Sequence, residues 1–464
     1  MDVKLSKATL YKDAASVTET KATEVKKAVP ITAVVAEVTA TKASAATVKS
    51  AKSEFQLSGS AQKALLSDQL DQKVSDKTEL VAQKKWTAGG VPIRDNVPDY
   101  NFFGKRFDDF NALNHPKVLS TGSGDDKVDI QMGKDGRVHV NVNGKESWSG
   151  TPEQFKRLTI DTGAGRDTVT NTVEGANIRT GEGDDFVANN ASGTHIDTGD
   201  GNDGVVSRGD SNQISTGNDR DWVVSNGGRN TIVSGSGADD VRSFGSMNSI
   251  KTEDGDDYVR SEGDKNKIEM GRGNDAIQGF GDGNVYSGGE DRDKIEFTGS
   301  RNVIDAGAGD DLINAKGNFN WIAAREGNDQ INVTGDDNAI SGGEHNDVLN
   351  TFGSRNSVNG DEGDDQINTT GDYNSVNSGE GNDFINAAGN RNTIQGEAGF
   401  DRIDVKGNDS NINAGDNDDK VNVQGDRNTV DGGAGRDQVD LNGEGNTFSA
   451  QDFIEKHQFP DFSK

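Results

Sequence analysis

Apolar and polar positions along residues 161–449 follow a repeat of 18 residues, with no insertion or deletion inside it. One apolar row runs from Val169 to Val439, and a second runs from Ile178 to Phe448. Apolar and polar side chains alternate around these positions, as in short β-strands with one buried face, and Gly, Asn and Asp between them favour turns. Because one unit cannot bury its own apolar face, consecutive units must stack and share a core. The pattern predicts an all-β chain built on a parallel β-solenoid, or β-roll, of about 16 turns.

The predicted core of this solenoid is thin. The positions two residues after the second apolar row hold small side chains: Thr180, Thr198, Thr216, Ala306, Gly342 and Gly360. With neighbouring strands about 4.8 Å apart, 16 turns would give a rod about 75 Å long.

Changes in amino-acid composition and apolar spacing divide the residues outside the repeat into several segments. Residues up to 57 are rich in Ala, Thr, Val, Lys and Ser with no stable period. A helical spacing of apolar residues follows at Ser58–Trp86, and hairpin and helix signals occur at Val138–Val142 and Pro152–Arg157. The predicted segments are a largely disordered N-terminal arm at 1–57, a helix plus aromatic lead-in at 58–118, an N-terminal cap with the first repeat and a hairpin insertion at 119–160, the β-roll at 161–449, and a C-terminal cap or tail at 450–464.

The composition excludes several classes of protein. Of 464 residues, 78 are acidic and 49 basic, giving a net charge of −29, which disfavours nucleic acid and favours cations as partners. Only 30% of the residues are hydrophobic. None is cysteine, which excludes disulfides and thiolate metal sites. No apolar run approaches the roughly 20 residues of a membrane span, and the N-terminal sequence lacks the apolar centre of a signal peptide.

An unbroken series of aspartates is the main candidate for chemistry. An Asp occurs at every eighteenth position of the repeat, and one further copy precedes the series. Glycine occupies the positions four and two before the Asp in most units, so that a unit reads G-x-G-x-D-x-U, where U is Val, Ile or Leu. The candidate metal-binding aspartates are Asp126, Asp167, Asp185, Asp203, Asp221, Asp239, Asp257, Asp275, Asp293, Asp311, Asp329, Asp347, Asp365, Asp383, Asp401, Asp419 and Asp437. The candidate glycines are Gly163, Gly165, Gly181, Gly183, Gly199, Gly201, Gly307, Gly309, Gly379, Gly381, Gly433 and Gly435.

Stacking places these aspartates about 5 Å apart, where two unit charges repel by about 0.8 kcal/mol even at the dielectric constant of water. A column of such charges opposes folding unless divalent cations lie between the turns. Calcium suits the pattern because it accepts six to eight oxygen ligands from carboxylates and carbonyls, and glycine lets the backbone turn its carbonyls toward an ion. The expected cofactor is therefore Ca²⁺, with several ions along one edge of the solenoid.

The motif resembles that of a known family. The segment Gly181–Val187 is similar to the nonapeptide GGxGxDxUx of repeat-in-toxin (RTX), or hemolysin-type, calcium-binding proteins, which form a parallel β-roll. The resemblance covers about residues 121–449, roughly 70% of the chain. It implies that each Asp of the series binds calcium through its carboxylate, and that carbonyls of the flanking residues and of the next turn complete the shell.

The sequence departs from the family pattern in two ways. Only alternate nonapeptides keep the motif, so calcium is expected on one edge, while the other edge has G-x-x-N turns with an Asn series from Asn212 to Asn446. Some motif turns also lack a glycine, and weaker or missing sites are expected there. These turns lie at 217–221, 253–255, 325–327 and 343–345.

Each of these features also has an interpretation without a specific function. The Asp series could be an Asx-turn ladder that binds no metal, and the Asn series is best interpreted as structural. Phe186, Trp222 and Tyr258 follow an Asp in every second turn and could stack on sugar rings or on a protein, although scattered surface aromatics are equally usual. Without insertions that could build a pocket, and without a catalytic constellation near the N-terminus, the chain is expected not to be an enzyme.

Two functions remain open from the sequence. The first is a secreted bacterial calcium-binding β-roll that folds or is stabilised by calcium outside the cell, after export by a signal-peptide-independent route of type I or type III. The second is an adhesin or effector rod that binds a host protein, a polysaccharide or another matrix component, in which calcium is only structural. Neither function involves nucleic acid or a membrane span.

Overall fold

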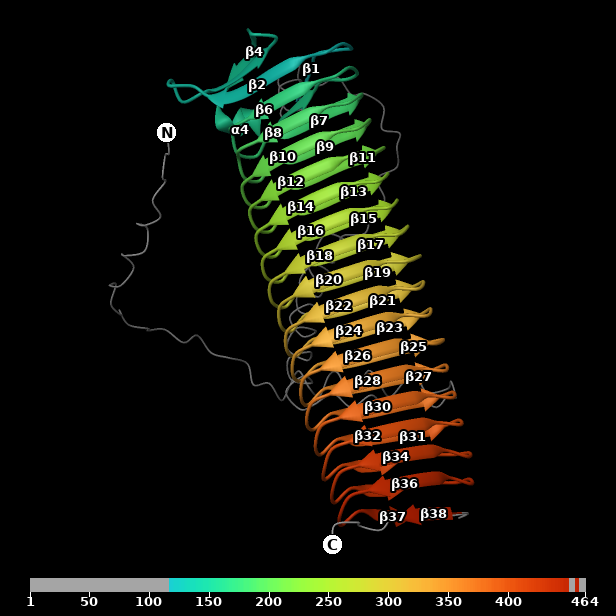
Figure 1. Ribbon diagram of the computed structural model, residues 1–464. Coiled ribbons are helices and arrows are strands. Elements are labelled where there is room, and N and C mark those ends of the chain that lie inside the picture. The colour runs from blue at the N-terminus through green and yellow to red at the C-terminus, as the bar shows by residue number, and fades with distance from the viewer. Residues whose placement is uncertain (1–116, 450–454, 459–464) are drawn as a thin grey trace, which may run out of the picture. The chain divides into compact units, whose positions relative to one another are not determined.

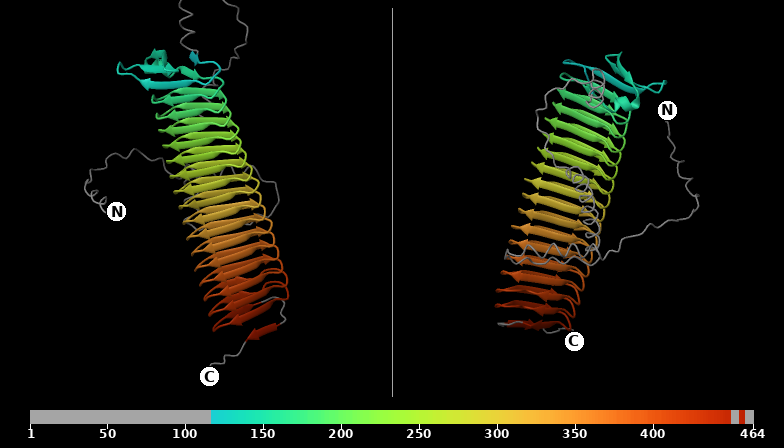
Figure 2. Two further views of the ribbon diagram at one scale, coloured as in Figure 1. Left: turned by 45° about the horizontal axis from the view of Figure 1, so that its top comes forward. Right: turned by 180° about the vertical axis from the view of Figure 1, so that it is seen from behind.

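The computed structural model describes residues 117–449 and 455–458, which form a parallel β-solenoid of about 16 turns with an 18-residue period (Figure 1). Each turn contributes one strand to each of two facing sheets, and the turns stack along one axis (Figure 2). The predicted fold is confirmed. The predicted disordered arm, the predicted helix at Ser58–Trp86 and the predicted aromatic lead-in up to residue 116 lie outside the described residues.

The first sheet has 18 strands. In spatial order its strands are β1 (Lys117–Ser120), β5 (Leu158–Asp161), β7 (Asn177–Glu182), β9 (His195–Asp200), β11 (Gln213–Asn218), β13 (Thr231–Ser236), β15 (Ser249–Asp254), β17 (Lys267–Arg272), β19 (Val285–Glu290), β21 (Val303–Ala308), β23 (Trp321–Glu326), β25 (Ala339–Glu344), β27 (Ser357–Glu362), β29 (Ser375–Glu380), β31 (Thr393–Ala398), β33 (Asn411–Asn413), β35 (Thr429–Asp431) and β37 (Thr447–Ser449). All pairs in this sheet are parallel, and the repeat fixes their register, so that Ile214 lies opposite Ile232.

The second sheet starts in the N-terminal cap. Its strands in spatial order are β4 (Lys145–Gly150), β3 (Val138–Val142), β2 (Lys127–Met132), β6 (Thr168–Asn171), β8 (Phe186–Asn189), β10 (Gly204–Arg208), β12 (Trp222–Asn226), β14 (Asp240–Phe244), β16 (Tyr258–Glu262), β18 (Ala276–Phe280), β20 (Lys294–Thr298), β22 (Leu312–Lys316), β24 (Gln330–Thr334), β26 (Val348–Phe352), β28 (Gln366–Thr370), β30 (Phe384–Ala388), β32 (Arg402–Lys406), β34 (Lys420–Gln424), β36 (Gln438–Asn442) and β38 (Glu455–Gln458). The pairs β2–β3 and β3–β4 are antiparallel and the others are parallel.

The N-terminal cap covers the first turn of the solenoid. The hairpin β3–β4 turns at Asn143 and Gly144, both with positive φ, as the sequence predicts. The short helix α4 (Pro152–Phe155) begins with a capping box at Thr151, and its fully buried Phe155 packs on Trp148 with ring centroids 5.9 Å apart. Strand β1 (Lys117–Ser120) pairs in parallel with β5 at the N-terminal end of the first sheet.

The core lies between the two sheets and consists mainly of the two predicted apolar rows, with further inward residues such as Phe297 and Val333 and apolar residues of the cap. Inner side chains such as Val223 and Ile232 are fully buried, and each contacts the equivalent residue one turn away through the parallel register. Among the residues described, no helix is long and apolar enough to cross a membrane. The stacked turns form two edges. We call the turns from the first sheet to the second the Asp edge, and the turns from the second sheet to the first the Asn edge.

Candidate metal-binding edge

The Asp series forms a continuous interior column along the Asp edge. Each Asp from Asp167 to Asp437, here called a ladder aspartate, directly precedes a strand of the second sheet. All sixteen of these residues are 0–6% exposed. The sequence predicts their stacking, whereas the structure adds that the carboxylates point into the coil rather than to solvent.

One oxygen of each ladder carboxylate is already committed. The Oδ1 atom accepts the backbone N–H of the equivalent residue in the preceding turn, at 2.7 Å from Asp167 N to Asp185 Oδ1 and 3.1 Å from Asp419 N to Asp437 Oδ1. The same contact recurs in the intervening turns at 2.7 to 2.9 Å. The column thus ties neighbouring turns together through the backbone.

The second oxygen of each ladder carboxylate accepts no hydrogen bond from the described part of the chain. Within the described residues, the Oδ2 atom of every ladder aspartate is buried and has no hydrogen-bond partner. A buried carboxylate oxygen without a partner destabilises the folded chain unless a proton or a cation is bound to it.

Burial raises the pKa of the ladder carboxyl groups from Asp185 to Asp437, and the negative charges of neighbouring aspartates act in the same direction in most turns. The raised pKa values are about 6 for Asp203, Asp257 and Asp329, about 7 for Asp221, Asp275, Asp311, Asp365, Asp401 and Asp419, and about 8 for Asp293 and Asp347.

Asp126, the first copy of the motif, is different. Its backbone N–H continues the column to Asp167 Oδ1 at 2.8 Å. Its two carboxylate oxygens, however, accept hydrogen bonds from the Thr121 hydroxyl and the Asn143 amide of the cap. Asp126 therefore resembles an end cap of the column more than a member with a free oxygen.

The motif glycines bring backbone carbonyls into the column. All twelve predicted glycines have φ between +84° and +146°. A Cβ at Gly181 would lie 1.8 Å from the carbonyl oxygen of Gly163, and one at Gly183 would lie 2.0 Å from that of Gly165. Each turn therefore presses its carbonyls against the glycines of the next turn, and a larger residue there would separate the turns.

The turns that lack a glycine keep the same backbone. Glu253, Arg325, His345 and Asp219, in the four turns expected to be degraded, have φ of +76°, +90°, +82° and +76°. The same is true of four residues that the sequence analysis did not single out: Asp291, Asp361, Glu397 and Asn417. Positive φ is costly for such residues, so stacking against neighbouring turns imposes the conformation.

The donor set of the Asp edge determines which ions fit it. In residues 117–449, no group of three or more His, Cys, Asp or Glu side chains is placed so that it could hold a metal ion by itself. Each turn instead offers one uncommitted carboxylate oxygen beside a column of carbonyls. A hard cation such as calcium, which accepts carbonyl ligands, fits this donor set, whereas a metal that needs nitrogen or sulfur ligands does not.

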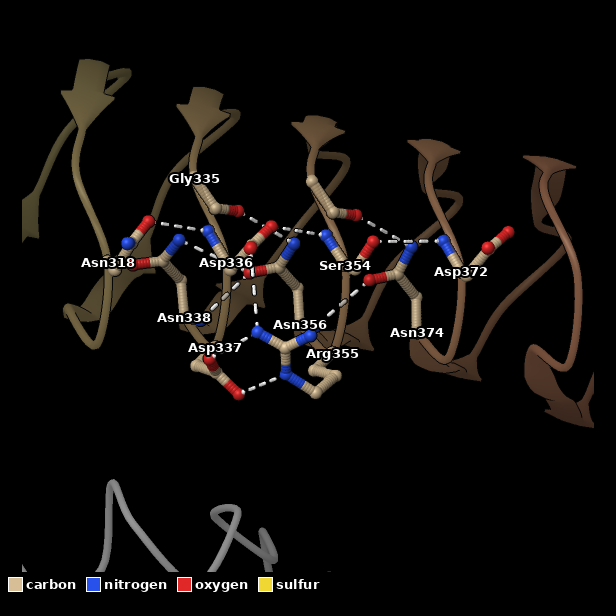
Figure 3. A network of polar contacts seen from close by, with 11 residues as sticks. Asn318, Gly335, Asp336, Asp337, Asn338, Ser354, Arg355, Asn356, Asp372 and Asn374 are labelled. Atoms are coloured by element: carbon tan, nitrogen blue, oxygen red, sulfur yellow. Dashed lines mark hydrogen bonds and ion pairs between the residues drawn. The ribbon is translucent and has the colours of Figure 1, made fainter.

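The Asn edge repeats the backbone contact with neutral side chains (Figure 3). Asn356 N–H donates to Asn374 Oδ1 at 2.9 Å, as the ladder aspartates do on the opposite edge. The second polar atom of Asn374 is satisfied, because its Nδ2 donates to the Gly353 carbonyl at 3.0 Å, whereas the Nδ2 atoms of Asn284, Asn302, Asn320 and Asn392 are buried without a partner among the described residues. The left-handed residue is the one before each Asn, such as Arg355 with φ of +60° and Tyr373 with φ of +62°.

A second column on the Asn edge was missed by the sequence analysis. In Figure 3, side-chain oxygens of Asn318, Asp336 and Ser354 accept the backbone N–H of Asp336, Ser354 and Asp372 at 2.8, 2.8 and 3.2 Å. The signal was present in the sequence, since the residue after the glycine in G-x-x-N is Ser, Asp or Asn in most turns. This edge is therefore cross-linked twice in most turns by neutral or surface side chains.

The outward aromatic residues do not form one continuous row. Phe186 and Trp222 stack with ring centroids 5.9 Å apart and an interplanar angle of 28°, and the Trp222 ring covers the intervening Gly204. Trp222 remains 42% exposed. Tyr258 hydrogen-bonds instead to Gln278 at 3.3 Å.

A scan of the chain against protein-family models gives no match, and a search of curated proteins finds no similar chain.

Proposed function

We propose that the solenoid is a non-catalytic calcium-binding β-roll whose stability depends on cations bound along the Asp edge. The observation that carries the proposal is the series of sixteen buried Oδ2 atoms without partners. The ligands would be these oxygens and the carbonyls of the motif turns. Bound calcium would supply positive charge that offsets both the buried carboxylates and their mutual repulsion.

The proposal links metal binding to location. In a cytoplasm poor in calcium, the charged column would oppose folding and keep the chain suitable for export by a signal-peptide-independent type I or type III route. Millimolar calcium outside the cell would then stabilise the stacked turns. The net charge of −29 supports attraction of cations to the folded rod.

Far-UV circular dichroism of the full chain tests this function. The protein is titrated from excess chelator into millimolar calcium, with magnesium as the control. We expect β-structure or its thermal stability to increase with calcium, and much less with magnesium, which demands a stricter geometry. A chain with the same spectrum and the same melting temperature in chelator and in calcium would contradict the proposal.

A second function is favoured by the Phe186–Trp222 pair. Stacked and partly exposed aromatic rings offer a surface for sugar rings or for a protein partner, as in an adhesin or effector rod. The variant Trp222→Ala should then lose binding to the polysaccharide or host protein while its calcium response stays unchanged. A glycan array, followed by the same calcium titration, separates the two functions. Array binding equal to that of the wild type would exclude this pair as the binding surface.

A further inference from the structure

The residue five positions before each ladder aspartate points into the coil and differs between the two halves of the Asp edge. We call these sixteen positions the inner row. In the first six turns they carry hydroxyl groups, whereas in later turns they are mostly Gly or Ala. The inner row consists of Thr162, Thr180, Thr198, Thr216, Ser234, Thr252, Met270, Gly288, Ala306, Ala324, Gly342, Gly360, Ser378, Gly396, Ala414 and Gly432.

Threonines of the inner row satisfy the backbone of the next turn. The Thr180 hydroxyl donates to the Thr198 carbonyl at 3.1 Å, and the Thr198 hydroxyl donates to the Thr216 carbonyl at 3.1 Å. The hydroxyls of Thr162, Thr216, Thr252 and Ser378 make the same contact at 2.9 to 3.2 Å. In these turns the hydroxyl fills the space beside the ladder carboxylate and donates a hydrogen bond to the carbonyl oxygen of the next turn.

At glycines of the inner row, the ladder carboxylate and a carbonyl of the next turn lie in the space that a side chain would fill. At Gly360, the point where a Cβ would lie is 2.2 Å from Asp365 Oδ2 and 2.3 Å from the Ser378 carbonyl oxygen. At Gly288 the corresponding distances are 2.2 Å to Asp293 Oδ2 and 2.4 Å to the Ala306 carbonyl.

Two further turns have the same arrangement of oxygens. The space at Gly342 faces Asp347 Oδ2 at 2.2 Å and a carbonyl oxygen at 2.8 Å, and that at Gly396 faces Asp401 Oδ2 at 2.6 Å and the Ala414 carbonyl. In each case a buried carboxylate oxygen and a carbonyl oxygen are aimed into one space without a donor between them. Two acceptors that face each other repel unless a positive charge or a proton lies between them.

We propose that the inner row selects which turns of the Asp edge take up a cation: turns with glycine at Gly288, Gly342, Gly360 and Gly396 bind it, and turns with threonine do not. This inference rests on the proposed calcium function and refines it. In a threonine turn, an entering ion would have to displace a hydroxyl and break its bond to the next carbonyl. In a glycine turn, no side-chain hydroxyl competes with the ion for these two oxygens.

The test measures calcium bound per chain by equilibrium dialysis and atomic emission, using the full-length protein. Replacing glycines by the residue used in the first turns, in Gly360→Thr, in Gly342→Thr and in the two combined, should lower bound calcium in step with the number of replacements. The backbone at these two glycines has ordinary φ, so threonine needs no left-handed conformation. The reverse variant Thr198→Gly should increase bound calcium.

Gly228→Ser is the matched control, because Gly228 lies on the Asn edge in a row where Ser192 and Ser246 occur naturally. Its calcium content should equal that of the wild type. If the Gly→Thr variants fold and keep the wild-type calcium content, the selection by the inner row is wrong while the calcium function stands. If they fail to fold, Thr198→Gly decides, and unchanged calcium content there also overturns the inference. A wild-type chain that binds no calcium would instead refute the proposed function itself.

Discussion

The two edges of the solenoid use the same backbone contact but differ in one atom of the side chain. On both edges a side-chain oxygen accepts the N–H of the equivalent residue in the preceding turn, at 2.8 Å for Asp347 N to Asp365 Oδ1 and 2.9 Å for Asn356 N to Asn374 Oδ1. The amide nitrogen of Asn374 then donates to a carbonyl, whereas Asp365 Oδ2 has no partner in the described structure. The comparison teaches that stacking requires only one oxygen per turn, so the second carboxylate oxygen must serve another purpose or cost stability.

Placing a charge on the Asn edge should cause the largest loss of folding stability. The variant Asn374→Asp would lose the bond to Gly353 and leave a buried carboxylate oxygen without a partner. We expect the free energy of unfolding at pH 8 to fall by about 3–5 kcal/mol, since the buried carboxylate would have no compensating charge or donor. Urea unfolding measures this. The exposed variant Asn226→Asp is the control, and equal losses in both variants would show that burial at the Asn edge is unimportant.

Removing a charge from the Asp edge should increase the stability of the fold in the absence of calcium. Asp347→Asn keeps the oxygen that accepts the Asp329 N–H and replaces the unpartnered Oδ2 by a donor. In chelator at pH 8 the free energy of unfolding should rise by about 1–3 kcal/mol, and the stabilisation by calcium should decrease. Asp416→Asn, an exposed carboxylate on the same edge, should change neither quantity. A less stable Asp347→Asn protein in chelator would contradict the interpretation.

The pH dependence should separate the edges further, because only the Asp edge titrates in its interior. Eleven of the folded ladder carboxyls have pKa values raised to about 6 to 8, such as about 6 for Asp203 and about 8 for Asp293, above roughly 3.9 in the unfolded chain. The folded state therefore binds more protons, and stability in chelator should fall as pH rises from about 4 to about 8. For each group the loss is about 1.4 kcal/mol per pH unit between its two pKa values.

Thermal unfolding in chelator from pH 5 to pH 8.5 measures this dependence, and saturating calcium should reduce it. Stability that rises with pH in chelator would mean that the ladder carboxylates are charged and compensated in another way.

The smallest effect concerns the motif turns that lack glycine. His345 occupies a glycine position of the motif with φ of +82°, where a side chain costs about 1 kcal/mol. The variant His345→Gly should therefore gain up to about 1 kcal/mol in urea unfolding. Glu344→Gly, one residue earlier in β25, should instead lose about 0.5–1 kcal/mol because its backbone is an ordinary strand. A loss in both variants would show that His345 makes contacts that outweigh its backbone strain.

Much of this structure could be predicted because every position recurs at the same place in the repeat. The two apolar rows, the stacking of the Asp series and the cap hairpin follow from spacing and turn chemistry alone. The sequence also contains a signal for the burial of the ladder aspartates. Asp221, for example, stands two residues before the buried Val223, and strand alternation puts both side chains on one face.

Other features of the candidate site could not be predicted. Sequence alone does not show that Asp361 or Glu397 adopts positive φ, because neighbouring turns impose it. Nor does it show that the Thr180 hydroxyl is directed at a carbonyl, since the contact depends on the distance between stacked backbones.

The unbroken period has a consequence for how such a chain can change in length. Each turn pairs only with its two neighbours, and the residue after a removed unit would meet the same kind of environment as before. Deleting residues 347–364 would therefore shorten the rod by one step of about 4.8 Å while preserving both sheets and both edges. Recombination between similar units would lengthen it by the same step. The number of ion-binding turns, and with it the calcium capacity, would then be inherited as a count of repeats.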